Sequence, residues 1–235
     1  MGIIMKRSRI NAEIQSAIKL FDQIGFKLPP FAFWTPEDWS GRINQVREIM
    51  DNRLGWDVTD YGHNTFDKMG LLLFTIRKGN AGQPDIYAKP YAEKLMVCRE
   101  GQVAPMHFHW RKMEDIINRG GGNLVLRMHG AAPDGTLSRE AFEVSIDGQK
   151  IRVEPGQEII LTPGESIFLE PFVYHEFYAQ QGTGPVVIGE VSSVNDDEED
   201  NRFLESMGRF PAIEEDEPPL YLLCTDYKER VLKII

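Results

Sequence analysis

Two histidines, His107 and His109, stand one residue apart in this 235-residue sequence, and Glu114 follows a short distance later. Side chains two positions apart on a β-strand point to the same side of the sheet. Two imidazoles on an inward face lose hydration, and a divalent cation that uses their lone pairs compensates for this loss. His175 lies in a second strand-like stretch, PFVYHEFYA. Three imidazole nitrogens and one carboxylate are typical of a transition metal with open positions for water or substrate, so we predict a metal site at these four residues.

The spacing of glycines around these histidines supports that prediction. A His-x-His pair on a strand is more often a chance surface pair than a pair of metal ligands. Here Gly101 precedes His107 by six positions, and Gly164 precedes His175 by eleven. The remaining histidines, His63 and His129, have no such surroundings. We expect those two to be exposed or satisfied by ordinary hydrogen bonds.

The elements that must position the ligands are short β-strands. After residue 62 the sequence consists of short apolar runs that Gly, Pro, Asn and Asp separate, as is typical of a β-sandwich or jelly roll rather than of alternating βα units. The expected strands are residues 71–77, 93–100, 123–130, 141–146, 149–154, 157–162, 166–170 and 185–194.

Two helices are expected before the strands. Residues 8–26 carry an apolar stripe at helical spacing, with Ser8 as the expected N-cap. That stripe consists of Ile10, Ile14, Ile18 and Phe21. A second helix is expected from Thr35, with Pro36 at its first position, and its apolar face consists of Ile43, Val46 and Ile49. Because short isolated helices are marginal in water, we predict that an arm of about residues 8–55 packs on the barrel of a single domain, residues 1–235.

Composition excludes several classes of protein. The formal net charge of −10 repels a phosphate backbone, so nucleic acid is not an expected partner. No apolar run is long enough to span a bilayer, and the first residues lack the features of a signal peptide. Cys98 and Cys224 form no motif. These features predict a cytoplasmic protein without disulfides or membrane contact.

The two glycine-framed stretches resemble the two motifs of the cupin superfamily. The first follows G-x5-H-x-H-x4-E-x6-G closely, whereas the second keeps the Gly-to-His spacing but has Phe172 in the usual place of glycine and Ala179 in that of asparagine. Over nearly the whole length, the sequence is similar to the D-lyxose isomerase family of cupin sugar isomerases. The stretches that carry this similarity are LPPFAFWTPEDW, LGWDVTDYG, KPYAEKL, EGQVAPMHFHWRKMEDIINRGGG, LTPGESI and GEVSSVNDDEEDNRFLESMGRFPAIEEDEPP.

This resemblance implies a mainly β fold, a cupin (double-stranded β-helix or jelly-roll) barrel with N-terminal α-helices. It also implies an aldose–ketose isomerase that uses Mn2+ or a similar divalent ion and acts on a monosaccharide: D-lyxose and D-xylulose, and also D-mannose and D-fructose. Lys112 would assist catalysis, and Lys94 would bind substrate. Glu205 is the first choice for the general base, and Glu190 and Glu214 are its rivals; Glu214 is otherwise expected to bind substrate.

Two other functions fit the same ligand set. A non-haem dioxygenase could use three histidines and a glutamate for iron and oxygen. A non-catalytic sugar-binding cupin would keep the barrel without a competent base. The apolar arm and the exposed edges of the barrel also favour a homodimer. The sequence alone does not decide the preferred sugar or the native metal, nor whether a proton or a hydride moves.

Overall fold

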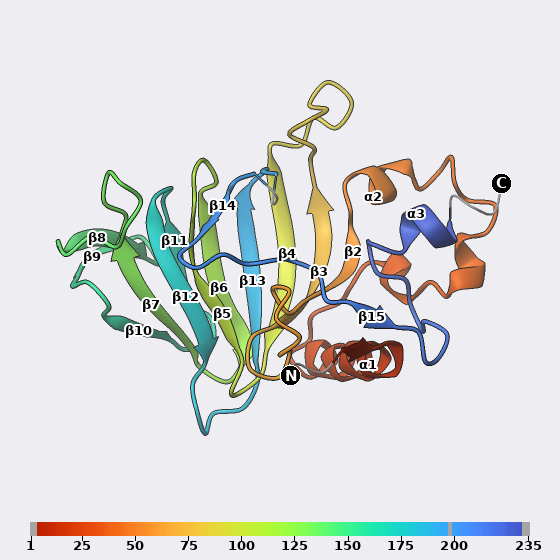
Figure 1. Ribbon diagram of the computed structural model, residues 1–235, viewed down its shortest axis with the longest axis horizontal. Helices are drawn as coiled ribbons and strands as arrows, with labels where there is room; N and C mark the ends of the chain where they lie inside the picture. Colours follow the sequence, from red (N-terminus) through yellow and green to blue (C-terminus); the bar gives the residue numbers. More distant parts are fainter. Residues whose placement is uncertain (1–3, 197–198, 232–235) are drawn as a thin grey trace.

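Antiparallel β-strands dominate the computed structural model, which describes residues 4–196 and 199–231 (Figure 1). Within these residues the larger sheet has eight strands in the order β2-β3-β4-β13-β6-β11-β8-β9, and the smaller has five in the order β10-β7-β12-β5-β14. The strands of the larger sheet are β2 (Gly55–Thr59), β3 (Leu71–Lys78), β4 (Tyr91–Cys98), β6 (Glu114–Gly121), β8 (Phe142–Ile146), β9 (Gln149–Val153), β11 (Ser166–Leu169) and β13 (Val186–Ser193). Those of the smaller are β5 (Val103–His109), β7 (Leu124–Gly130), β10 (Glu158–Leu161), β12 (Val173–Ala179) and β14 (Asn201–Phe203).

The two sheets pack face to face. One apolar cluster joins Met96, Ile116 and Ile188 of the larger sheet to Leu126 and Phe177 of the smaller. Side chains alternate between the two faces of each strand, so every second residue faces the space between the sheets. Near one end of that space the inward residues become polar and charged, and there they line a cavity.

The first predicted helix forms and buries its apolar stripe. Helix α1 (Arg7–Gln23) lies against the β2–β3 end of the larger sheet (Figure 1). Phe21 stacks on Trp56 of β2, with ring centroids 6.3 Å apart. The expected cap is wrong: the helix begins at Arg7, and the Ser8 hydroxyl instead donates a hydrogen bond to Asp216.

The second predicted helix is interrupted. Thr35 donates its backbone N–H to Asp38, and only the short 3-10 helix η2 (Pro36–Trp39) follows. Gly41 then adopts a φ of +74°, which breaks the helix before α2 (Arg47–Asp51). The remaining short helices are η1 (Pro30–Phe33) and α3 (Tyr227–Arg230).

The segment after β13 packs on the barrel in its described parts, and residues 197–198 of its acidic run lie outside the described residues. β14 pairs with β5, and β15 (Ile213–Glu214) pairs with β1 (Met5–Lys6) beside α1. The fully buried Arg7 bonds to Glu215 and Asp226 and so links α1 to the last part of the chain. Among the helices that the structure describes, each is too short or too polar to cross a bilayer.

Candidate metal centre and its cavity

A cavity of about 380 Å3 lies between the two sheets. Both sheets contribute to its wall, and the segment after β13 covers part of it through β14 and residues 207–209. Its polar lining consists of Asp57, Thr59, Tyr61, Thr75, Lys94, His107, His109, Lys112, Glu114, His175, Glu190, Asn201 and Arg209. The cavity therefore contains the four predicted metal ligands together with two lysines and a further buried glutamate.

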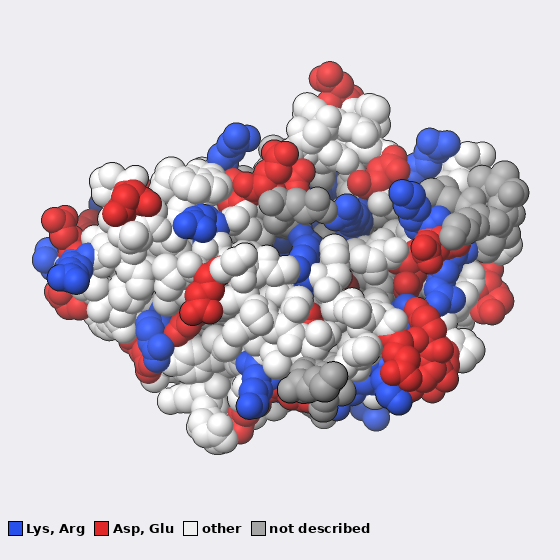
Figure 2. Space-filling view, in the orientation of Figure 1, with Lys and Arg blue, Asp and Glu red and all other residues white. Residues whose placement is uncertain are grey.

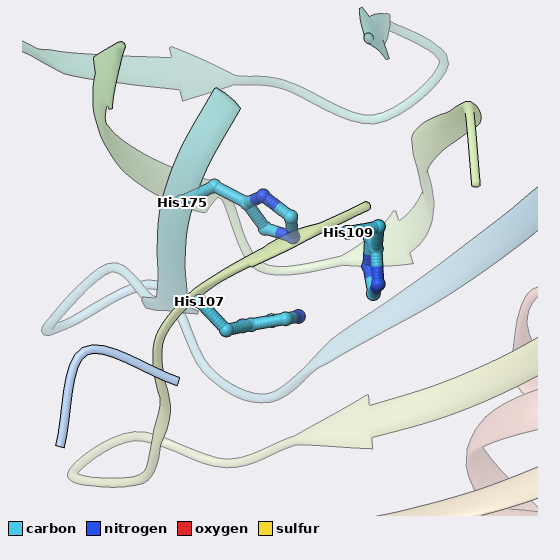
Figure 3. Close-up of side chains that lie close together, drawn as sticks. All are labelled: His107, His109 and His175. Atoms are coloured by element: carbon cyan, nitrogen blue, oxygen red, sulfur yellow. The ribbon is translucent and has the colours of Figure 1, made fainter. Parts of the chain in front are cut away.

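Three of the predicted ligands converge. His107 and His109 lie on β5, and His175 lies on the neighbouring strand β12 in direct register with His107. Their ligand atoms all lie within 4.8 Å of one another, and their rings point into one space (Figure 3). The alternation of β5 places both of its histidines on the inner face, as predicted, while Phe108 between them is fully buried against Tyr174 on the other face.

Backbone carbonyls set the tautomers of two of these histidines. The carbonyl oxygen of Pro105 accepts a hydrogen bond from Nδ1 of His107 at 2.8 Å, and that of Val173 accepts one from Nδ1 of His175 at 3.0 Å. Because a carbonyl can only accept, Nδ1 carries the hydrogen in both rings. The lone pair of each Nε2 is therefore available to a metal ion, which is the usual arrangement of metal-binding histidines.

Glu114, the fourth predicted ligand, lies at the start of β6 beside two of these histidines. Its Oε1 lies 3.1 Å from Nε2 of His109 and 3.3 Å from Nε2 of His175. Oε1 of Glu114 and Nε2 of His109 are both buried and without a hydrogen-bond partner. Buried polar atoms are costly to leave unpaired, and a cation between them would satisfy both. The residues present thus fit a divalent metal ion.

The surroundings also keep these side chains in the protonation states that bind metals. Burial lowers the pKa of His107 well below its usual value, and the neighbouring His175 adds to this effect. Burial and the Lys112 ammonium lower the pKa of His109. Burial opposes ionisation of Glu114, but Lys112 and His109 hold the pKa of this carboxyl well below its usual range. At neutral pH His107 and His109 are therefore neutral imidazoles, and Glu114 is a carboxylate.

A chain of buried charges connects the ligand set to Glu190 on β13. Lys112 Nζ lies 2.7 Å from Oε2 of Glu114 and 3.1 Å from Oε1 of Glu190. Lys94 Nζ donates to the same Glu190 oxygen at 3.1 Å, and the Ser192 hydroxyl donates to it at 2.9 Å. Two lysines and two glutamates balance in formal charge, so a bound divalent cation would leave the cavity with excess positive charge. Such a cavity suits a substrate that becomes anionic during reaction.

The structure does not bring the late acids of the sequence to the cavity. Glu205 follows the end of β14 and is exposed, and Glu214 on β15 is exposed beside Lys6, with the Nζ–Oε1 distance at 3.7 Å. Neither belongs to the described cavity lining. The physical reason is that β14 ends at Phe203, whose ring contacts His107 with centroids 5.2 Å apart, so the segment covers the site with an aromatic ring rather than a carboxylate.

Sequence reasoning missed six polar residues of the cavity: Asp57, Thr59, Tyr61, Thr75, Asn201 and Arg209. Asp57 and Arg209 meet at its far end, with Nη2 and Oδ2 3.3 Å apart. Asn201 lies opposite His109 in the β5–β14 register, and its Oδ1 is buried without a hydrogen-bond partner. The signal available for Asp57 was its acidic side chain in the otherwise apolar stretch LGWDVT; Arg209 and Asn201 lie far along the sequence from the ligands and gave none.

Comparison with known proteins identifies the family. The model of the family described as D-lyxose isomerase matches residues 5–227. The chain belongs to the D-lyxose isomerase family. A D-lyxose/D-mannose isomerase of Serratia proteamaculans is 50% identical to the chain over 224 residues, which cover 95% of this chain and 98% of that protein. One of Escherichia coli O157:H7 is 48% identical over 227 residues, covering 96% and 99%.

Solved structures show that this family member has the cupin-type fold that its motifs predict. The L-ribose isomerase of Acinetobacter sp. DL28 in complex with L-ribose matches with a TM-score of 0.59 at 13% identity, over 91% of this chain and 99% of that one. The L-ribose isomerase of Cellulomonas parahominis with L-ribose matches with a TM-score of 0.56 at 16% identity, over 91% and 100%. At such low identity these likenesses concern the fold alone.

Proposed function

We propose that this member of the D-lyxose isomerase family is a metal-dependent aldose–ketose isomerase. Its substrates would be D-lyxose, which gives D-xylulose, and D-mannose, which gives D-fructose. The observation that carries the proposal is Glu190, a buried carboxylate 3.1 Å from both Lys94 and Lys112 in the cavity where three histidines converge. The names of the two relatives support the choice of sugars.

His107, His109, Glu114 and His175 would hold the metal ion, which we propose is Mn2+. When bound, a divalent cation supplies positive charge that polarises the carbonyl and neighbouring hydroxyl of the open-chain sugar. The chain's own contribution is to hold these donors in a buried place and to keep their lone pairs free. Mixed nitrogen and oxygen donors also bind zinc, cobalt or iron. Our choice of Mn2+ therefore rests on the resemblance to the family.

Glu190 would move the proton. Its carboxylate removes the proton from C2 of the aldose, the electron pair forms a C1–C2 double bond, and negative charge develops on O1. The O2 proton passes to O1 and the C2 proton returns from Glu190 to C1, which leaves a carbonyl at C2. Lys94 and Lys112 are hydrogen-bond donors beside this path, and their positive charge stabilises the anionic enediolate.

Glu190 replaces Glu205 as our choice for the base. A base must lie within hydrogen-bond reach of the proton that it removes, in a place from which water is largely excluded. Glu190 lies inside the cavity and is buried, whereas Glu205 is exposed beyond the end of β14. Glu114 is committed to the metal, so Glu190 is the carboxylate of the described lining that remains beside both lysines.

We also propose that the protein is a homodimer and acts in the cytoplasm. The paired Trp110 and Phe172 support self-association, since both are exposed and their rings lie 5.7 Å apart, between centroids, on the outside of the smaller sheet. Light scattering coupled to gel filtration at micromolar concentration measures the mass. A single species of about 27 kDa, the mass of one chain, would contradict the dimer.

The proposed function is tested by offering the purified protein a panel of pentoses and hexoses, after chelation and again after addition of Mn2+. We expect ketose formation from D-lyxose and D-mannose that disappears with chelator and returns with the metal. An oxygen electrode in the same reactions tests for a dioxygenase, which would consume oxygen. Sugar binding without turnover in the Mn2+-loaded protein would instead indicate a non-catalytic binding protein.

A further inference from the structure

A second cavity of about 220 Å3 adjoins the first one, and we call it the side chamber. The two cavities share three lining residues, Asp57, Thr75 and Arg209. The β3–β4 loop, drawn in yellow at the top of Figure 1, begins at the side chamber, which Gly79–Gly82 help to line. The side chamber therefore begins where the cavity around the metal ligands ends.

The register of the larger sheet gives the direction from one cavity to the other. Glu190 pairs with Lys94, and Lys94 pairs with Thr75, so these three residues form one row across β13, β4 and β3. Adjacent strands lie roughly 4.8 Å apart, which places Thr75 about 10 Å from Glu190 along the row. Glu114 lies on β6, on the opposite side of β13 from β4. A sugar with C1 and C2 between the metal ligands and Glu190 would therefore extend its remaining carbons past Lys94 toward Thr75.

The lining of the side chamber suits a neutral hydroxyl-rich group. The described lining contains three basic residues, Arg53, Lys78 and Arg209, and three acidic residues, Asp51, Asp57 and Asp196, so the formal charges of these described residues cancel. Figure 2 likewise shows acidic and basic side chains beside one another on the upper part of this face. An anion such as a sugar phosphate would meet as many negative as positive groups here. Hydroxyl groups both donate and accept hydrogen bonds, so they match such a mixed surface.

Asn195 follows shortly after β13, and among the described residues that line the side chamber its side chain has buried polar atoms without a hydrogen-bond partner. Its side chain lines the chamber and the residue is only 6% exposed, yet neither Nδ2 nor Oδ1 has a hydrogen-bond partner. A buried amide with both ends unpaired is rare, because each unpaired polar group costs about 1–3 kcal/mol. A hydroxyl group can pair with either end, since it both donates and accepts.

We propose that the side chamber is a chain-length subsite, which receives the sixth carbon of a hexose with its hydroxyl, beyond the reach of a pentose, and that Asn195 bonds to this hydroxyl. This subsite rests on the proposed function. Residues outside the metal centre would then determine whether the protein accepts a six-carbon sugar. A pentose would be held by the metal-side cavity alone. A hexose would use both cavities, so contacts in the side chamber would change hexose turnover selectively.

The test compares kcat/KM for D-lyxose and D-mannose in the full-length Mn2+-loaded protein and in its Asn195→Leu variant. Leucine has the branching and the number of side-chain heavy atoms of asparagine but forms no hydrogen bonds, and the replacement removes a buried amide that the structure leaves unpaired. We expect kcat/KM for D-mannose to fall about tenfold, the effect of one lost hydrogen bond, and that for D-lyxose to stay within about threefold. Asn195→Ala, which cannot crowd the chamber, should show the same selectivity.

Asn201→Leu is the matched control. Asn201 also has an unpaired buried oxygen, but it lines the metal-side cavity and not the side chamber. We expect its kcat/KM to fall by a similar factor for both sugars. Equal effects of Asn195→Leu and Asn195→Ala on the two sugars, or a wild-type enzyme that isomerises D-lyxose but not D-mannose, would overturn the subsite. Absence of turnover with every sugar would instead overturn the proposed function.

Discussion

Lys112 and Glu190 form a buried ion pair in which Nζ lies 3.1 Å from Oε1. The same ammonium lies 2.7 Å from Glu114, so a single lysine lies between the carboxylate that we propose as a metal ligand and the carboxylate that we propose as the base. Without this cation the two carboxylates would repel each other across a buried space, and one of them would tend to take up a proton. Lys112 thus allows both to stay ionised close together.

The first prediction concerns Glu190. Glu190→Gln keeps the size of the side chain but cannot accept the C2 proton, and loss of a positioned base costs roughly 100-fold to 10,000-fold in rate. We expect kcat to fall on that scale while metal content stays unchanged. Exchange of the C1 or C2 hydrogen with solvent deuterium, followed by NMR, should disappear with it. Glu205→Gln is the matched control and should stay within a few-fold of wild type.

A different result would redirect the mechanism. Turnover of Glu190→Gln within a few-fold of wild type would remove Glu190 as the base, and a large loss in Glu205→Gln would indicate that the segment after β14 supplies it instead. Wild-type turnover without any incorporation of solvent deuterium would indicate transfer of a hydride between C1 and C2.

The second prediction concerns Lys112. Lys112→Met leaves two buried carboxylates facing each other, and removal of one partner from a buried ion pair typically costs about 3–5 kcal/mol. We expect a loss of that order in the free energy of unfolding, measured by urea denaturation of chelator-treated protein. Lys94→Met is the control, because Lys94 lies within ion-pair distance of Glu190, whereas Lys112 lies within that distance of both Glu190 and Glu114. An equal or smaller loss in Lys112→Met than in Lys94→Met would contradict the bridging role.

The third prediction concerns the metal. His107→Ala removes one of three converging imidazoles and should abolish tightly bound metal in elemental analysis. His129→Ala, at a histidine outside the cluster, should bind as much metal as wild type. In the wild-type protein, a metal concentration of 1,000 times Kd should stabilise the fold by about 4 kcal/mol. A ligand that binds only the folded state raises the melting temperature. If neither chelator nor added Mn2+ changes the melting temperature, the proposed metal site is contradicted.

The fourth prediction concerns the N-terminal arm, which we propose is part of the same folding unit as the barrel. The Arg7 guanidinium is fully buried between Glu215 and Asp226, at Nη2–Oε1 and Nη2–Oδ1 distances of 2.7 and 2.9 Å. Arg7→Ala removes the positive charge beside the buried carboxylate of Asp226. We expect the free energy of unfolding, measured by urea denaturation, to fall by about 3–5 kcal/mol. Arg9→Ala removes a half-exposed arginine from the same helix and is the control. It should lower the free energy of unfolding by about 1 kcal/mol or less.

Limited proteolysis provides an independent test of the arm. The apolar face of α1 packs on β2 and β3, so protease should not release residues 1 to about 55 as a stable fragment. A clean cut near residue 55, with both fragments resistant to further digestion, would show that the arm folds separately.

The fifth prediction concerns pH. Burial raises the pKa of the Cys98 thiol to about 12, and both cysteines are buried and unpaired. In the unfolded chain a thiol ionises near pH 8.5, so the unfolded state gains stability above that pH while the folded state does not. We expect the free energy of unfolding to fall as the pH rises from about 8.5 toward 12. Ellman's reagent at pH 8 should label neither cysteine until denaturant is added; rapid labelling of the native protein would contradict this burial.

Much of the site could be predicted because its signals are local. The spacing of His107 and His109 places both on one face of a strand through the two-residue period of β-structure alone. The similarity to the D-lyxose isomerase family, which the family model and the relatives confirm, rests on motifs along nearly the whole chain. The apolar stripe of the first helix also identified its buried face correctly, because helical periodicity is a property of neighbouring residues.

Other features depended on which distant segments meet. The sequence contains many acids after residue 195, and no local pattern distinguishes one that faces the cavity from one that faces water. Pairing of β13 with β4 and β6 places Glu190 beside Lys94 and across from the metal ligands, whereas the end of β14 leaves Glu205 exposed. Asp57 and Arg209 also come from distant parts of the sequence, and they meet where the metal-side cavity adjoins the side chamber. The sequence by itself thus determined the type of barrel, the family and the histidines that converge in the cavity, because short-range periodicity and motif spacing carry that information. Only the tertiary structure decided which carboxylate lies beside the lysines and where the cavity continues, because long-range pairing and burial set both.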